Sequence, residues 1–204
     1  MSKITKISVQ EKNKKRCNLF LDNEFYAGVS LETVLKFRLK VGDDIDQAGL
    51  ADLIFDSDKV EALSKAVAYT TKALKTKKQV KTYLSSKGYS YDVIKYCIAK
   101  LEEYCLVDDL NYSVKFIELN SNNQGKHLLE YKLMEKGVSK DVISMALEHV
   151  EIDLNKSAKA IAEKRLKDKK ITREILSKTY RYLVGKGFSY DEVNFALSGF
   201  VIED

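Results

Sequence analysis

Apolar positions in the last two thirds of the chain recur three and four residues apart, the period of an amphipathic α-helix. Three stretches, each about fifty residues from the next, carry the same apolar face at i, i+3, i+4 and i+7. Their residues are Ile94/Cys97/Ile98/Leu101, Ile143/Ala146/Leu147/Val150 and Val193/Ala196/Leu197/Phe200. The repetition predicts three equivalent helices in one chain.

Each of these helices follows one shared hexamer: KGYSYD at 87–92, KGVSKD at 136–141 and KGFSYD at 186–191. The glycine can adopt the left-handed conformation that closes a helix, and the lysine before it suits the helix C-terminus. The serine can cap the next helix, and the aspartate then lies in its first turn. Each hexamer therefore predicts a joint between two helices.

A further helix is expected before each joint. Thr76 to Gln79 and Ser121 to Gln124 fit the capping-box pattern, and Thr172 occupies the matching place in the third copy. Still earlier helical stretches are expected around 60–74, 110–120 and 155–168. Each unit is thus predicted to be three helices in about 45–50 residues, stacked as an array.

The first sixty residues have another pattern. Segments 4–9 and 16–29 are β-like, with Asp22-Asn23 as a hairpin turn. A helix is expected from Ser30 to about Val41-Gly42, and a short helix after Asp46.

The predicted fold is mainly α: tandem three-helix repeats in an elongated solenoid-like array, preceded by a small β-hairpin and helical segment. The absence of proline, which breaks helix interiors, agrees with this. The expected divisions are 1–59 for the N-terminal segment and 60–109, 110–154 and 155–204 for repeats one, two and three.

Candidate chemistry is sparse, and we expect no catalytic residue, no metal and no cofactor. His127 and His149 lack metal-ligand spacing, and Asp108-Asp109 is best read as a helix cap. The three cysteines are expected to be buried reduced thiols. The N-terminus has no signal-peptide core and no stretch is apolar enough for a membrane span, so a cytoplasmic protein is predicted.

The distribution of charge along the repeats is more informative about function than the candidate catalytic residues. Residues 61–109 hold nine basic and six acidic groups, 110–154 hold five and seven, and 155–204 hold eleven and seven. The excess gathers before the second helix of the outer repeats, where we expect it not to be neutralised. The candidate binding residues are Lys75, Lys77, Lys78, Lys81, Lys164, Arg165, Lys167, Lys169, Lys170 and Arg173.

Two interpretations of these clusters stay open. A run of charge is usually a solvated face of the protein. Two clusters at equivalent places could instead meet phosphates or an acidic protein surface. Tyr83 and Tyr182, beside the joints, are expected in the core rather than in a stacking role.

The arrangement resembles the RecX regulatory protein family over roughly residues 60–200. The features that carry the resemblance are the tandem three-helix repeats, the Lys-Gly-apolar joint in each, and Val107-Asp108-Asp109 at the end of the first repeat. The N-terminal segment is similar to an extension found in members from low-GC Gram-positive bacteria.

The resemblance implies a monomeric negative regulator of the RecA recombinase, in recombination, DNA repair and the SOS response. Such proteins bind in the groove of the RecA–DNA filament and limit its assembly, ATP hydrolysis and strand exchange. This chain is only mildly basic and its middle repeat is acidic, which favours protein contacts over independent binding of single-stranded DNA. The alternatives are a sequence-nonspecific nucleic-acid-binding protein and a helical adaptor for another assembly.

Overall fold

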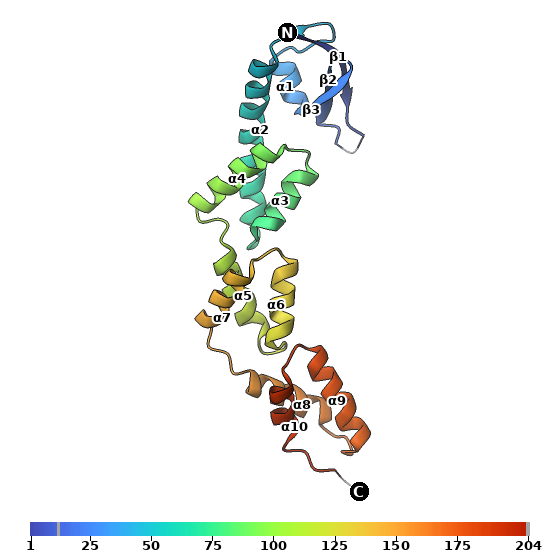
Figure 1. Cartoon of the computed structure of the whole chain (residues 1–204), viewed down its shortest axis with the longest axis vertical. Coiled ribbons are helices and arrows are strands. Elements are labelled where there is room, and N and C mark those ends of the chain that lie inside the picture. The colour runs from blue at the N-terminus through green and yellow to red at the C-terminus, as the bar shows by residue number, and fades with distance from the viewer. Residues whose placement is uncertain (12, 203–204) are drawn as a thin grey trace. The chain divides into compact units, whose positions relative to one another are not determined.

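The chain begins with a four-stranded antiparallel sheet. The structure is a computed structural model that describes residues 1–11 and 13–202, so Lys12 and the last two residues of the predicted third repeat lie outside it. Strands β1 (Ser2–Val9), β2 (Arg16–Leu21), β3 (Glu24–Ser30) and β4 (Asp44–Ile45) lie in the order β3-β2-β1-β4. Figure 1 shows β1 to β3 beside helix α1 (Leu31–Lys36).

The predicted hairpin is confirmed. Asp22 and Asn23 connect β2 to β3 with φ values of 49° and 70°, the left-handed pair that a two-residue hairpin turn requires. The short β4 was not predicted, because two residues carry no alternating pattern. Helix α1 is shorter than predicted: Ser30 caps it as expected, but it ends at Lys36, and Arg38 has a positive φ of 51°.

Helix α2 (Gln47–Thr70) corrects the sequence prediction. The short helix expected after Asp46 and the stretch expected at 60–74 form one continuous helix of 24 residues. Its buried side chains recur every fourth residue and form one stripe: Leu50, Ile54, Asp58, Ala62, Ala66 and Thr70. The polar Asp58 interrupts the apolar pattern of this stripe in the sequence. The pattern therefore did not indicate one continuous helix across the expected boundary at 59/60.

Nine helices follow α1 in the described residues, and they are arranged in threes. The first set is α2, α3 (Lys77–Ser86) and α4 (Tyr91–Glu103), and the second is α5 (Asp109–Asn120), α6 (Lys126–Glu135) and α7 (Lys140–His149). The third set is α8 (Leu154–Leu166), α9 (Arg173–Gly185) and α10 (Tyr190–Leu197). In each set the third helix packs on the first. The mainly helical, three-helix-repeat fold class is confirmed.

The three joints have the predicted conformation. Gly88, Gly137 and Gly187 have φ values of 85°, 87° and 86°, which favour glycine over any residue with a Cβ. Ser90, Ser139 and Ser189 each accept a hydrogen bond from a backbone amide in the first turn of the next helix. Asp108 likewise caps α5 by accepting from the amides of Leu110 and Asn111.

Thr76 and Thr172 cap the second helices of their repeats as predicted, but Ser121 does not. Ser121 lies at the C-terminal end of α5, and α6 begins five residues later with Gly125 at its N-cap and no side-chain cap. Two amides at the start of α6 are instead hydrogen-bonded to carbonyls of the next repeat. The amide of Gly125 donates to the carbonyl of Lys186 at 2.9 Å, and that of His127 to the carbonyl of Gly187 at 3.1 Å.

Two compact units divide the chain, Met1–Val107 and the part from Asp108 onward. The first contains the sheet and the first repeat, with one core under the sheet and another among α2, α3 and α4. Leu50 and Ile54 of α2 belong to the former core, and Ala62 and Ala66 to the latter. One helix therefore builds both cores. The second unit contains repeats two and three, each with its own core.

The thiols differ from the prediction in one case. Cys17 and Cys97 are buried and free, and burial raises the pKa of Cys97 to about 11. Cys105 is exposed and lies beyond the end of α4, with a left-handed φ of 54°. In the part of the chain that the structure describes, none of the helices is long and apolar enough to cross a membrane.

Candidate partner-binding surfaces

The first basic cluster lies where α2 connects to α3. Lys75 is in the connection and half-buried, Lys77 begins α3, and Lys78 and Lys81 are exposed on that helix. The cluster was expected to lack neutralising charge, and this is wrong for Lys77, which forms an ion pair with Glu102 of α4. Lys78 and Lys81 are the exposed members of this cluster.

Aromatic rings hold several of these cations in place. Tyr69 and Tyr83 stack face to face, with ring centroids 4.2 Å apart and planes 7° from parallel. The Nζ of Lys75 lies 5.0 Å from the Tyr69 centroid, and that of Lys87 lies 5.4 Å from the Tyr83 centroid. The result is a four-layer stack of cation, ring, ring and cation. Such contacts contribute about 0.5–1 kcal/mol each at exposed sites and restrict the lysines.

The second basic cluster occupies the equivalent connection in the third repeat. Lys164 and Arg165 are in the last turn of α8, Lys167 ends it, and Arg173 begins α9. Lys169 and Lys170 lie in the connection, and every member except the half-buried Arg165 is exposed. Because the connection is short, the six cations lie close together along the chain.

The second cluster repeats the cation–aromatic arrangement. The guanidinium carbon of Arg165 lies 4.2 Å from the Tyr182 centroid, and the Nζ of Lys186 lies 5.4 Å from it. Tyr182 is 36% exposed, so the expectation that it belongs to the core is wrong. Tyr83 is half-buried and packs against the core of its repeat.

Lys87 and Lys186 are candidate binding residues that the sequence reasoning missed. A signal was present: the outer repeats have Tyr-x-x-x-Lys immediately before the joint glycine, as Tyr83/Lys87 and Tyr182/Lys186. Residues four apart lie on one helix face, so the ring and the cation must meet. The middle repeat has Lys132 in place of the tyrosine.

The connection of the middle repeat is nearly uncharged and has another task. Its sequence ELNSNNQG ends at Gly125, whose amide bonds to the joint of the third repeat. The joint lysine of this repeat, Lys136, lies 5.8 Å from the centroid of the Phe116 ring. This connection therefore serves packing within the second unit rather than display of charge.

Residues 1–11 and 13–202 contain no group of three or more His, Cys, Asp and Glu side chains that could hold a metal ion. Both histidines are exposed, and the Nδ1 of His149 lies 2.7 Å from the carbonyl oxygen of Met145. The joint serines accept amide hydrogen bonds at helix starts, a structural task.

Three family models match separate parts of the chain. The regulatory protein RecX N-terminal domain matches residues 2–46, the first RecX three-helix domain matches 62–101, and the third RecX three-helix domain matches 151–197. Together they span the sheet, α1 and most of the first and third repeats.

Curated relatives match over nearly the whole chain. The chain is 38% identical to the Regulatory protein RecX of Clostridium botulinum strain Eklund 17B over 196 residues, which are 94% of this chain and 92% of that protein. It is 34% identical to the Regulatory protein RecX of Staphylococcus aureus strain JH9, over 71% of this chain and 54% of that protein.

Two solved structures are similar. A crystal structure titled regulatory protein RecX aligns with a TM-score of 0.66 at 23% identity, over 97% of this chain and all of the other. RecX from Lactobacillus salivarius aligns with a TM-score of 0.63 at 26% identity, over 70% of this chain and 96% of the other. Both likenesses support the fold.

Proposed function

The chain belongs to the RecX family of regulatory proteins, and we propose that it is a negative regulator of the RecA recombinase. In this proposal it docks in the groove of the RecA–DNA filament. Docking limits filament assembly, ATP hydrolysis and strand exchange. RecA is the partner, and single-stranded DNA is bound weakly or through the filament.

The observation that carries the docking mechanism is the equivalence of the two basic connections. The cation–aromatic stack of the first repeat and the Arg165/Tyr182/Lys186 stack of the third recur at the same place in the repeat. The middle repeat shows Phe116 and a joint lysine but no basic connection. A polymer offers the same surface at regular intervals, and repeated cationic surfaces on one chain suit such a partner.

Two modest contacts on one chain reinforce each other. Once the first cluster has bound, the second binds as if at high local concentration, so weak single contacts can give useful overall affinity. The cations would meet phosphates of the filament DNA or carboxylates of RecA. The regulation needs no bond-making step, because occupancy of the groove is enough.

The proposal is tested by reversing exposed charge in each cluster. One variant carries Lys78→Glu and Lys81→Glu, and a second carries Lys169→Glu, Lys170→Glu and Arg173→Glu. Lys77 is left intact because its ion pair with Glu102 contributes to the fold. The control carries Lys95→Glu, Lys156→Glu and Lys159→Glu, which are exposed positions of the same two repeats outside the clusters.

Binding to RecA-coated and to bare single-stranded DNA is measured at one low salt concentration. Each cluster variant should bind the coated filament about tenfold less tightly, since several phosphate or carboxylate contacts are lost. The control should bind like the wild type. Loss of bare-DNA affinity alone, with filament binding intact, would favour the nucleic-acid-binding protein. No change in either would show that the clusters are a solvated face.

A further inference from the structure

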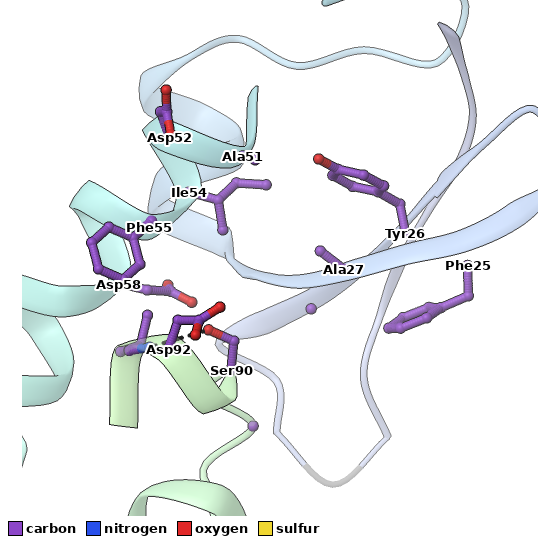
Figure 2. Close-up of a pocket in the computed structure, with 13 residues that line it drawn as sticks. Phe25, Tyr26, Ala27, Ala51, Asp52, Ile54, Phe55, Asp58, Ser90 and Asp92 are labelled. Atoms are coloured by element: carbon purple, nitrogen blue, oxygen red, sulfur yellow. Dashed lines mark hydrogen bonds between the residues drawn. The ribbon is translucent and has the colours of Figure 1, made fainter. Parts of the chain in front are cut away.

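A cleft of about 750 Å³ lies in the first unit (Figure 2). It is bounded by strand β3, the first half of α2, and the first joint with the start of α4. Its volume falls in the range of about 300–1,000 Å³ typical of binding sites. The cleft plays no part in the function proposed above.

The cleft runs along the edge of the sheet. Four consecutive residues of β3, from Phe25 to Gly28, line it. In the pairing with β2 a bulge makes Tyr26 an extra residue between Phe25 and Ala27, so side chains along this segment do not alternate regularly between the two faces. In the sheet of the described residues β3 is the outermost strand. An extended peptide can lie along such an edge.

The walls of the cleft are acidic. Three carboxylates line it, from Asp52, Asp58 and Asp92, and no lysine or arginine is among its lining residues. Asp58 is engaged by Arg16, at 2.8 Å. Asp52 and Asp92 are exposed and form no ion pair in the part of the chain that the structure describes. These two carboxylates favour a cation over a phosphate at the cleft.

Aromatic rings complete the walls. Phe25, 60% exposed, and Tyr26 come from β3, and Phe55 comes from α2. The hydroxyl of Tyr26 donates to the carbonyl of Gln47 at 3.0 Å, which fixes the ring against the start of α2. Lys59 lies 5.5 Å from the Phe55 centroid, but it is paired with Asp56. Exposed rings beside unpaired carboxylates offer contacts to apolar and cationic side chains at once.

We propose that this cleft binds an extended segment of a partner protein that carries a lysine or arginine beside apolar residues. The segment lies along β3, its cation is attracted by the negative charges of Asp52 and Asp92, and its apolar side chains pack on the rings of Phe25, Tyr26 and Phe55. The unpaired carboxylates of the cleft favour such a segment over a nucleic-acid backbone. The first unit then carries two kinds of surface, the acidic cleft and the first basic cluster.

The test uses the full-length chain, labelled with nitrogen-15, and two peptides. The probe is acetyl-Gly-Leu-Arg-Leu-Gly-amide, and the comparison peptide has citrulline, the uncharged analogue of arginine, in the central position. The arginine peptide should shift the amide signals of residues 25–28 and 51–58, and the citrulline peptide should bind several-fold more weakly. Added salt should weaken the arginine peptide only.

Variants locate the site. Asp52→Asn with Asp92→Asn should weaken the arginine peptide about five- to tenfold, the loss expected for two partly exposed charge pairs. The matched control is Asp141→Asn, because Asp141 is the equivalent first-turn residue at the second joint and lies outside the cleft. That control should bind like the wild type. Equal melting temperatures of all three proteins verify that they are folded.

Several results would overturn the proposal. These are no shift at millimolar arginine peptide, equal binding of the arginine and citrulline peptides, or full affinity in the Asp52/Asp92 variant. Shifts of the cleft signals by a single-stranded oligonucleotide would assign it to nucleic acid instead. Self-association of the wild type that the Asp52/Asp92 variant abolishes would assign the cleft to a second copy of the chain, and would equally overturn it.

Discussion

The first and third joints have the same hexamer pattern and the same backbone, but their neighbours pack on them by different means. Gly88 and Gly187 have φ values of 85° and 86°. At the third joint the neighbour is a backbone, because the N-terminus of α6 lies directly on Gly187. At the first joint the neighbour is a side chain, that of Arg16 from β2.

The third joint leaves no room for a side chain on either partner. A Cβ on Gly125 would lie 2.3 Å from the carbonyl oxygen of Gly187, and a Cβ on Gly187 would lie 2.4 Å from the amide nitrogen of Leu128. The two backbones approach closely enough for carbonyls of one repeat to accept from amides of another. Glycine at both positions is what makes this contact possible.

The first joint uses charge and aromatic packing. The Nη2 of Arg16 donates to Asp58 of α2 at 2.8 Å and to the carbonyl of Gly28 at 2.6 Å. Its guanidinium carbon lies 4.7 Å from the ring centroid of Tyr89, the residue after the joint glycine. The side chains of Arg16 and Asp58 are each only 3% exposed. Joints with the same backbone conformation can therefore pack against a neighbouring element either through a buried ion pair or through direct backbone contact.

The largest predicted effect breaks the first contact. Arg16→Met leaves Asp58 charged and buried without its partner, which costs about 3–5 kcal/mol of unfolding free energy. Chemical denaturation measures the loss. Arg181→Ala, at an exposed position of α9, is the control and should change stability by less than about 0.5 kcal/mol.

A double variant sharpens this prediction. Arg16→Met with Asp58→Leu removes both charges and should recover much of the stability, since apolar replacements of a buried ion pair are often neutral. A loss below about 1 kcal/mol for Arg16→Met alone would contradict the view that the ion pair fixes the sheet on the first repeat.

The next effect breaks the second contact. Gly125 has an ordinary φ of −77°, so Gly125→Ala tests the clash alone and not the backbone conformation. The overpacked contact should cost about 2–3 kcal/mol, read as a lower denaturation midpoint. Gly185→Ala is the control, because a Cβ there meets nothing within 4 Å, and it should be neutral or slightly stabilising. Equal stabilities of the two variants would rule out the close contact.

The smallest predicted effect is a pH dependence of the unfolding free energy that arises at the first joint. Tyr89 is 5% exposed, and burial raises its pKa to about 12 from the ordinary value of 10.0. Between these values the unfolded chain loses the phenol proton while the folded chain keeps it. The stability that Tyr89 contributes is therefore full below pH 10 and falls by about 2 kcal/mol as the pH rises to about 12.

Tyr89→Phe isolates this contribution. Lys65, which donates to the Tyr89 hydroxyl at 2.8 Å, also has a shifted pKa: burial lowers it, but bonds to Glu61 and Tyr89 raise it overall. The stability that Lys65 contributes is lost in the same alkaline range, and the part of it that depends on Glu61 remains in the variant. Unfolding free energies of wild type and Tyr89→Phe, compared between pH 9 and pH 12, should therefore converge as pH rises. Parallel curves would contradict a buried, protonated Tyr89.

Local signals accounted for the parts of the fold that the sequence predicted. The joint glycines, their serine caps and the Asp22-Asn23 turn follow from the conformations that single residues favour. The errors arise where tertiary contacts override local preference. Ser121 fits a capping box, yet α6 begins at Gly125 because the third joint supplies the carbonyls.

Burial of charge is the other source of error. Asp58 marks an apparent end of the apolar pattern, but Arg16, 42 residues earlier in the chain, neutralises it inside the protein. For the candidate surfaces, the sequence located both basic clusters but missed the aromatic rings beneath them and the partner of Lys77. The acidic cleft was not predicted at all, because its carboxylates come from three separate segments.

The most direct test of the proposed function is RecA's ATP hydrolysis on single-stranded DNA. The purified chain, added at amounts well below one per RecA subunit, should slow hydrolysis, because in the proposed mechanism one molecule bound in the groove limits filament assembly around it. The two cluster variants should require higher concentrations for the same effect, and the Lys95/Lys156/Lys159 control should act like the wild type. Unchanged hydrolysis with one chain per RecA subunit would contradict the proposed regulation.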